Sequence, residues 1–107
     1  MANVYTNAKV DLTTTSVTTL YTAPALTTSI VNSILVSEDS GNADTITVTL
    51  TNSASVVFSL FKTKAVSANA TTELLTAPLV LQTGEVLKVT AASSNRLHVV
   101  ASFLEIS

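Results

Sequence analysis

Seven consecutive residues, Thr45 to Thr51, alternate strictly between threonine and an aliphatic side chain. A period of two residues places Ile46, Val48 and Leu50 on one face of an extended strand and the threonines on the other. A strand of this kind has an apolar face toward a core and a polar face toward solvent. The segment therefore predicts an antiparallel sheet that packs one face against a second layer.

The composition of the chain also favours β-structure. The 107 residues include 19 Thr, 14 Val and 4 Ile, whose β-branched side chains pack well on a pleated surface. Hydrophobic residues make up 47% of the chain and charged residues only 11%. Disordered chains are poor in apolar residues and rich in charge, so we expect this chain to fold. A chain of this length has room for one core, so we expect a single all-β domain.

Eight segments have alternating or continuous apolar residues bounded by turn residues. They are, in chain order, Val4–Val10, Val17–Tyr21, Thr28–Ser37, Thr45–Thr51, Val56–Lys62, Glu73–Leu81, Glu85–Ala91 and Arg96–Ile106. The polar stretch Lys64–Leu75 is expected to be a loop, and Gly84 is expected in a turn with a positive φ. Seven or eight short strands are typical of a single antiparallel β-sandwich, either jelly-roll or immunoglobulin-like. Residues 14–107 would form this sandwich, and residues 1–13 an N-terminal arm or edge strand.

Two of these segments are apolar on both faces. Alternation in Thr28–Ser37 sets Val31 and Leu35 opposite Ile30, Ile34 and Val36. Alternation in Arg96–Ile106 sets Val100, Leu104 and Ile106 opposite Leu97, Val99, Ala101 and Phe103. A strand of this kind is either central in the fold or covered by a partner. We therefore predict a protein interface that combines outward residues of both strands with two N-terminal residues: Val4, Tyr5, Val31, Leu35, Val100 and Leu104.

The sequence has few groups suited to catalysis or metal binding. It has no cysteine and one histidine, His98, which lies beside Val100 without a partner at a defined spacing. Oxygen atoms of the acidic stretch 37–44 could hold Ca²⁺, although a solvated turn needs the same residues. The leading interpretation is that the protein has no catalytic residue, no cofactor and no metal, with Ca²⁺ as the alternative.

Charge and aromatic content restrict the partners that we expect. Five basic and seven acidic residues leave a net charge of −2, which does not suit binding to nucleic acid. The apolar runs are far shorter than the ~20 residues of a membrane helix, and the first residues carry no secretion signal. Trp is absent, so stacking on sugar rings has little support. A protein partner is the remaining expectation.

Two short motifs resemble a known group of proteins. The first is Thr19–Pro24 followed by Thr28–Val36, and the second is Leu81–Val89 followed by a last strand that ends on Leu104–Ile106. Together they resemble small β-sandwich virion proteins of tailed bacteriophages. The resemblance implies a structural part of the virion, assembled in the host cytoplasm, that binds the major capsid protein or another virion protein.

A capsid decoration (cement) protein is the function that we expect from this resemblance and from the scarcity of catalytic groups. Such a protein binds across capsid subunits and stabilises the head, and a symmetric lattice favours a homo-oligomer, either a trimer or a dimer. A tail, head–tail adaptor or fibre-attachment protein is the alternative within the same class. A glycan-binding module of a host-recognition fibre is the alternative from another class.

Overall fold

The computed structural model describes residues 3–107, so Met1 and Ala2 of the expected N-terminal segment lie outside the described residues. The described residues form nine β-strands and no helix. The strands are β1 (Asn3–Leu12), β2 (Thr18–Thr22), β3 (Thr28–Glu38), β4 (Asp44–Thr51), β5 (Val57–Val66), β6 (Thr71–Glu73), β7 (Leu79–Leu81), β8 (Val86–Ala91) and β9 (Leu97–Ile106). This part of the chain accordingly has no helix that is long and apolar enough to cross a membrane.

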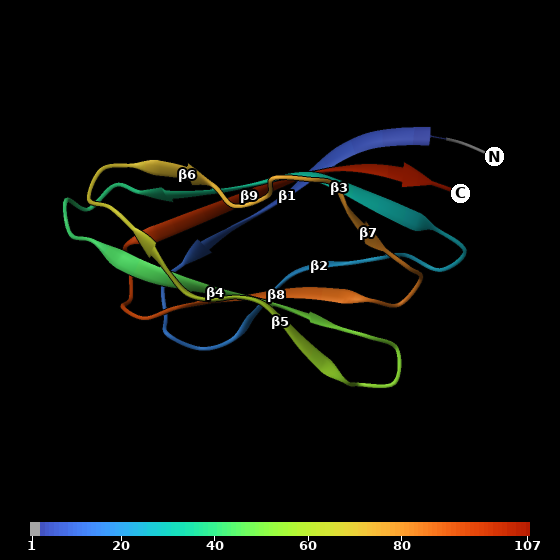
Figure 1. The fold of residues 1–107 in the computed structure, drawn as a ribbon, viewed down its shortest axis with the longest axis horizontal. Helices are drawn as coiled ribbons and strands as arrows, with labels where there is room; N and C mark the ends of the chain where they lie inside the picture. Colours follow the sequence, from blue (N-terminus) through green and yellow to red (C-terminus); the bar gives the residue numbers. More distant parts are fainter. Residues whose placement is uncertain (1–2) are drawn as a thin grey trace.

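The strands form two antiparallel sheets that pack face to face (Figure 1). Sheet A has the order β1-β9-β3-β6, and β7 pairs with the other half of β3. Sheet B has the order β2-β8-β4-β5. The prediction of a single antiparallel β-sandwich is confirmed, with nine strands in place of seven or eight.

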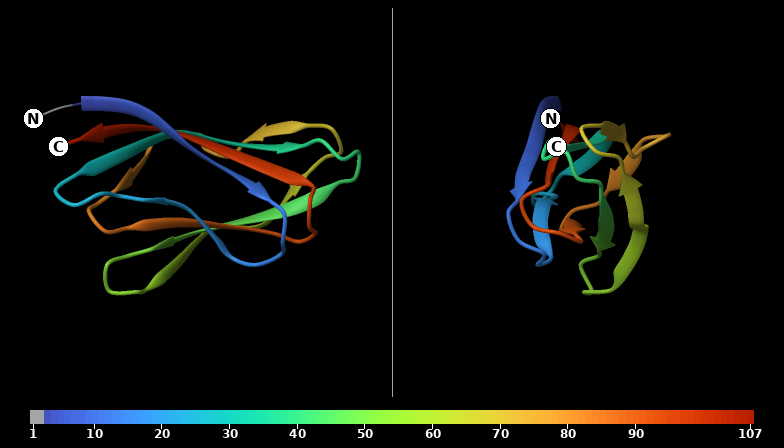
Figure 2. Two further views of the ribbon diagram at one scale, coloured as in Figure 1. Left: turned by 180° about the vertical axis from the view of Figure 1, so that it is seen from behind. Right: turned by 90° about the vertical axis from the view of Figure 1, so that its left-hand side faces the viewer.

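The strand pairs are nested along the chain. β1 pairs with β9, β2 with β8, β3 with β6 and β7, and β4 with β5, so each pair encloses the next in sequence. The chain therefore passes back and forth between the two sheets, as the path from blue to red in Figure 2 shows. This connectivity is that of a jelly roll, one of the two expected sandwich types.

The core lies between the inner faces of the two sheets. In sheet B, β4 contributes Ile46, Val48 and Leu50, and the neighbouring β8 contributes Leu87 and Val89. Thr45, Thr47 and Thr49 alternate with these buried residues and are only partly buried, so the predicted faces are confirmed over residues 45–50, whereas Thr51 is buried as well. The buried apolar residues of the central strands of sheet A are Val31, Ile34, Val36, Leu97, Val99, Ala101 and Phe103.

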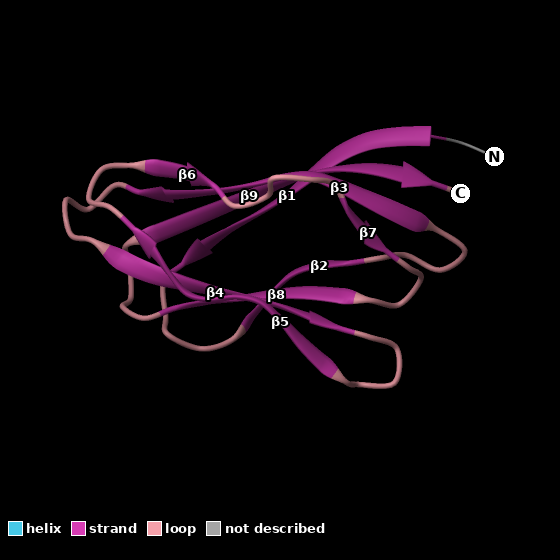
Figure 3. Ribbon diagram, viewed as in Figure 1, coloured by secondary structure: helices cyan, strands magenta, loops and turns pink. Residues whose placement is uncertain are grey.

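One expected strand is divided in the structure (Figure 3). The pattern predicts a single strand over Glu73–Leu81, but β6 and β7 pair with opposite ends of β3 and are separated by residues 74–78. Pro78 has no N–H to donate to a ladder, so pairing cannot continue through it. The expected loop Lys64–Leu75 is also wrong in part, because β5 extends to Val66 and β6 begins at Thr71.

A β-bulge in β3 changes the faces predicted for its first half. The pairing of β3 with β9 shifts between Val31 and Ser33, so Asn32 is an extra residue in the ladder. One extra residue moves the side chains on one side of it to the opposite face. Val31 therefore lies opposite Phe103 in the core with 0% exposure, and Ile30 points outward. The prediction that Val31 faces outward is wrong for this reason.

The described part of the N-terminal segment is an edge strand of sheet A. β1 pairs with β9 over its full length, from Asn3 opposite Ile106 to Leu12 opposite Leu97. Its Leu12 is buried, and the inward Ala8 and Val10 pack against the core. Residues 3–12 therefore belong to the sandwich and help to cover its core.

Candidate interaction site

His98 lies between two aspartates on the outer side of sheet A. Its Nε2 atom is 3.2 Å from Asp11 Oδ1, and its Nδ1 atom is 3.6 Å from Asp39 Oδ2. A neutral imidazole has one N–H, so both ring nitrogens can donate toward a carboxylate only when the ring is protonated. All three side chains are well exposed, which makes these ion pairs weak. Sequence reasoning missed them because they depend on the register of β1 with β9 and on the path of the β3–β4 loop.

The acidic stretch considered for Ca²⁺ is engaged by its own backbone. The buried Glu38 carboxylate accepts hydrogen bonds of 2.8–3.1 Å from the N–H groups of Ser40, Gly41, Asn42 and Asn69, and another from the Ser40 hydroxyl. Burial raises the pKa of Glu38, but the Ser40 hydroxyl and the backbone donors outweigh it and lower the pKa from 4.5 to about 2. Within residues 3–107, no group of three or more His, Cys, Asp or Glu side chains is placed to hold a metal ion.

Glu73 fills the gap that the divided edge leaves beside β3. Its carboxylate accepts hydrogen bonds from the Ile34 N–H at 2.8 Å, the Leu75 N–H at 3.2 Å and the Ser33 hydroxyl. Burial raises the pKa of the Glu73 carboxyl, but these hydrogen bonds outweigh it, so the pKa lies below its usual value. The carboxylate takes the place of the strand partner that β3 lacks between β6 and β7.

Tyr21 joins the two sheets near one end of the sandwich. Its ring, on β2, stacks on the ring of Phe103, on β9. Its hydroxyl donates a hydrogen bond to Glu105, which leaves the Ser29 hydroxyl as the donor in the 2.6 Å bond to Tyr21. Burial, together with the hydrogen bond to Glu105, raises the pKa of Tyr21 from 10.0 to about 12.

The carboxylates of Glu38, Glu73 and Glu105 share one property. Each accepts hydrogen bonds from hydroxyl or backbone N–H groups of the same chain. These hydrogen bonds fix a loop, a bulge and the contact between the sheets.

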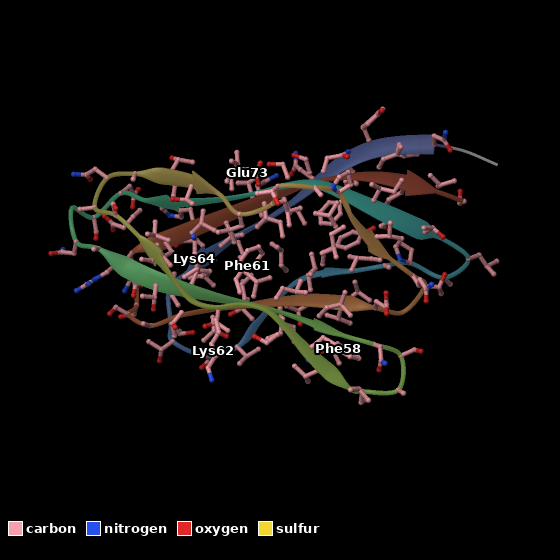
Figure 4. The ribbon with its side chains drawn as sticks, viewed as in Figure 1. Phe58, Phe61, Lys62, Lys64 and Glu73 are labelled. Atoms are coloured by element: carbon pink, nitrogen blue, oxygen red, sulfur yellow. The ribbon has the colours of Figure 1, made fainter. Side chains whose placement is uncertain are left out.

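A groove of about 470 Å³ lies between β5 and the connection from β6 to β7. Its lining is mainly apolar and includes Phe61 and Leu75, with the charged side chains of Lys64 and Glu73 beside them. Figure 4 shows Phe61 between the two sheets and Phe58 on the β4–β5 hairpin. The groove thus lies where β5, the edge strand of sheet B, faces β6 and the segment after it at the edge of sheet A.

Exposed and half-buried apolar side chains gather on the outer face of sheet A. Residues paired directly across antiparallel strands lie on the same face, so the register arranges them in rows. One row is Tyr5, Leu104, Ile30 and Val80, from β1, β9, β3 and β7. A parallel row is Lys9, Val100, Leu35 and Glu73, from β1, β9, β3 and β6. The six apolar residues of these two rows are called the face patch, within which Tyr5 is 79% exposed.

A second group of exposed apolar residues lies at the end of the sandwich where three turns meet. Leu26, in the β2–β3 turn, is 91% exposed, and Val56, Val57 and Phe58, in the β4–β5 hairpin, are 49–61% exposed. Figure 1 shows both connections at the same end of the long axis as the β7–β8 turn. These four residues are called the loop-end patch.

Hydrogen bonds fix the turn that carries Leu26. The Thr27 N–H donates to the Thr83 hydroxyl oxygen at 3.1 Å, and that hydroxyl donates to the Thr27 carbonyl at 2.8 Å. The β7–β8 turn also approaches the hairpin, because a Cβ atom added at Gly84 would lie 3.6 Å from Ser53 Cβ. The β7–β8 turn therefore connects the two halves of the loop-end patch.

The predicted interface residues are divided by the structure. Tyr5, Leu35, Val100 and Leu104 lie together in the face patch. Val4 is half exposed but points to the other side of β1, opposite Glu105, and Val31 lies in the core. Sequence reasoning missed Ile30 because of the bulge, and it missed Leu26, whose only signal is an apolar residue after Pro24 in a turn.

Comparisons with known proteins give no family assignment, because no family model, curated protein or solved structure matches the chain.

Proposed function

We propose that this protein is a non-enzymatic structural protein of a tailed-phage virion, which decorates the capsid and stabilises contacts between capsid subunits. The motifs in Thr19–Val36 and Leu81–Val89 support a virion protein by resemblance. The jelly roll is compatible with this function because it recurs in viral capsid domains, although a fold alone does not assign a function.

The observation that carries the proposal is the conformation of Leu26. This residue has a φ of 57°, a left-handed conformation that costs a non-glycine residue of order 1–3 kcal/mol. Its side chain is 91% exposed, so packing within the chain does not compensate for the strain. Strain of this kind is concentrated at binding sites, where the side chain is held ready for a partner.

The loop-end patch provides the means of attachment. Buried aromatic and aliphatic anchors usually dominate the affinity of a protein interface. Leu26 and Phe58 would enter apolar pockets at a seam between capsid subunits, while the rigid turns around them limit the entropy lost on binding. Many copies around a symmetric shell would then reinforce one another through the repeated lattice.

Cosedimentation with capsids that lack this protein tests the proposal. Leu26→Asn relieves the strain, because asparagine tolerates a positive φ, and it removes the apolar anchor. We expect unfolding stability to be unchanged or about 1 kcal/mol higher and capsid binding to be weaker by at least about tenfold. Val17→Asn is the matched control. Val17 is also an exposed apolar residue, at 65%, but it lies before β2, at the opposite end of that strand from Leu26 and outside the loop-end patch.

Two results would contradict the proposal. One is a folded wild-type protein that does not bind capsids, and the other is full capsid binding by both Leu26→Asn and Phe58→Ser. Binding to purified tails instead of capsids would favour the adaptor or fibre-attachment alternative. Binding to a glycan array that is lost in Tyr5→Ala would favour the glycan-binding alternative.

A further inference from the structure

In the two rows that hold the face patch, the charged side chains are Lys9 and Glu73, at opposite edges of sheet A. Asp11 lies further along β1 on the same outer face and is 3.2 Å from His98 of its own chain. In the row Lys9–Val100–Leu35–Glu73, the cation is on edge strand β1 and the carboxylate is on edge strand β6. Two aliphatic side chains, Val100 and Leu35, separate them. The row Tyr5–Leu104–Ile30–Val80 is apolar from one edge to the other.

We propose that a second copy of this chain covers the outer face of sheet A, across a two-fold axis that runs along the strands between β9 and β3. This inference goes beyond the proposed function, since it concerns self-association and uses a surface separate from the loop-end patch. A two-fold axis makes one surface contact itself, so each contact in the dimer occurs twice.

A two-fold axis in this direction places each row over the same row of the partner subunit, with the order of its residues reversed. Lys9 then lies over Glu73 of the partner subunit, and Val100 lies over Leu35 of the partner subunit. In the apolar row, Tyr5 lies over Val80 of the partner subunit, and Leu104 lies over Ile30 of the partner subunit. Both charges are thus paired, and apolar side chains meet apolar side chains.

A two-fold axis that runs across the strands, midway between the two rows, also stacks this face on itself. It lays β1 over β1 and places Lys9 over Tyr5 of the partner subunit. It also places Glu73 over Val80 of the partner subunit, so both charges are buried against apolar groups without a counter-charge. Because burying an unpaired charge is costly, charge complementarity selects the axis along the strands.

The area of this face suits a dimer of moderate affinity. Three strands of about ten residues, β1, β9 and β3, and the three-residue strands β6 and β7 lie about 4.8 Å apart and cover roughly 600 Å² of the face. Two copies would bury roughly 1,200 Å², the lower limit for specific interfaces. We therefore expect a reversible dimer whose Kd is in the micromolar range.

Sedimentation of the isolated chain over a concentration series from about 1 to about 500 μM tests this dimer, because that range spans the expected Kd. Val100→Lys places a charge at the centre of the face, and we expect this variant to remain monomeric. Thr90→Lys, on the outer side of β8 in sheet B, is the matched control, and its dimerisation should match that of the wild type. Lys9→Glu, which would face Glu73 of the partner subunit, should weaken the dimer by about tenfold.

Cross-linking tests the direction of the axis. The chain has no cysteine, so Tyr5→Cys and Val80→Cys each introduce a single thiol. Facing sheets lie about 10 Å apart, so a bis-maleimide of about that length should join the two variants when they are mixed. It should not join Tyr5→Cys to itself, because those two thiols would lie at opposite edges of the dimer.

Three results would overturn the inference. They are a wild-type chain that stays monomeric at every concentration, a dimer that is unaffected by Val100→Lys, and efficient cross-linking of Tyr5→Cys to itself. A monomeric chain that still binds capsids would overturn the dimer and leave the proposed function intact. A dimer that does not bind capsids would overturn the proposed function and leave the dimer intact.

Discussion

The rings of Tyr21 and Phe103 stack with 3.9 Å between their centroids and 24° between their planes. Tyr21 belongs to sheet B and Phe103 to sheet A, so this contact joins the two layers of the sandwich. The hydroxyl of Tyr21 extends the contact to Ser29 and Glu105. Ser29 lies in β3 just after the turn that carries Leu26, so the cluster fixes the β3 end of that turn.

Tyr21→Phe should lower the free energy of unfolding by about 1–3 kcal/mol. The substitution keeps the ring stack but leaves Ser29, which is fully buried, and the Glu105 carboxylate without the hydroxyl between them. Urea denaturation at pH 7 measures the loss. Tyr5→Phe is the control, because the ring of Tyr5 is exposed. An equal, small effect of both substitutions would show that the hydroxyl does not stabilise the fold.

The hydroxyl of Tyr21 should titrate at an unusually high pH. Its pKa is about 12 in the folded protein against an ordinary value of 10.0, because burial and the hydrogen bond to Glu105 disfavour the phenolate. Its contribution to stability is therefore fully present below pH 10 and lost as the pH rises through 12. The ultraviolet absorbance of the Tyr5→Phe variant follows this one tyrosine, and a folded-state transition near pH 10 would refute the prediction.

Stability should fall in acid because of Glu38. Its folded pKa of about 2 lies below the ordinary 4.5, so its contribution is present above pH 4.5 and is lost as the pH falls toward 2. Thermal unfolding between pH 7 and pH 2 measures this loss. Glu38→Gln should lower stability at pH 7 and flatten the acid slope, and Ser40→Ala, which removes only the hydroxyl donor, should have a smaller effect. An unchanged slope in Glu38→Gln would contradict the prediction.

Glu73→Gln should destabilise the protein by about 1 kcal/mol, because the bulged part of β3 loses a charged acceptor for the Ile34 N–H and the Ser33 hydroxyl. Chemical denaturation of Glu73→Gln, Ser33→Ala and the double variant measures the coupling between the two side chains. We expect the double variant to lose less stability than the sum of the single losses. Strict additivity would mean that the two groups act independently.

Thr51→Val should stabilise the protein by about 1 kcal/mol. The hydroxyl oxygen of Thr51 is buried and has no hydrogen-bond partner among the described residues. Valine has nearly the same shape and no polar atom, so the substitution removes a desolvation cost without opening a cavity. Thr49→Val, on the same strand, is the control for β-propensity. Equal effects of the two substitutions would assign the gain to propensity and not to the buried hydroxyl.

The inward and outward faces of the regular strands were predictable from the sequence. In Thr45–Thr51, for example, Ile46 and Val48 were expected to face the core, and both are buried. Alternation is a local property, so it indicates the face of each side chain as long as the ladder has no extra residue. The bulge at Asn32 was not predictable, because it arises from pairing with Phe103 and Ser102, about seventy residues further along the chain.

The candidate surfaces were predictable only in part. Tyr5, Leu35, Val100 and Leu104 were expected to face outward together, and they lie in one patch. Val80 was missed because its pairing with Ile30 depends on the division of the expected strand into β6 and β7. Lys9 and Glu73 were not expected to share a row, because nothing in the sequence indicates the order in which the strands pair.

Local pattern was enough to establish that this chain is an antiparallel sandwich with an unusually apolar last strand. Side-chain alternation and β-branched composition act over a few residues, so they can be read without knowledge of the pairing. Four other features appear only in the folded protein. They are the nested order of the strands, the inward-facing Val31, the left-handed backbone of the exposed Leu26, and the opposite charges of Lys9 and Glu73 at the edges of sheet A. They depend on contacts between segments far apart in sequence, and only the packing of both sheets around one core brings those segments together.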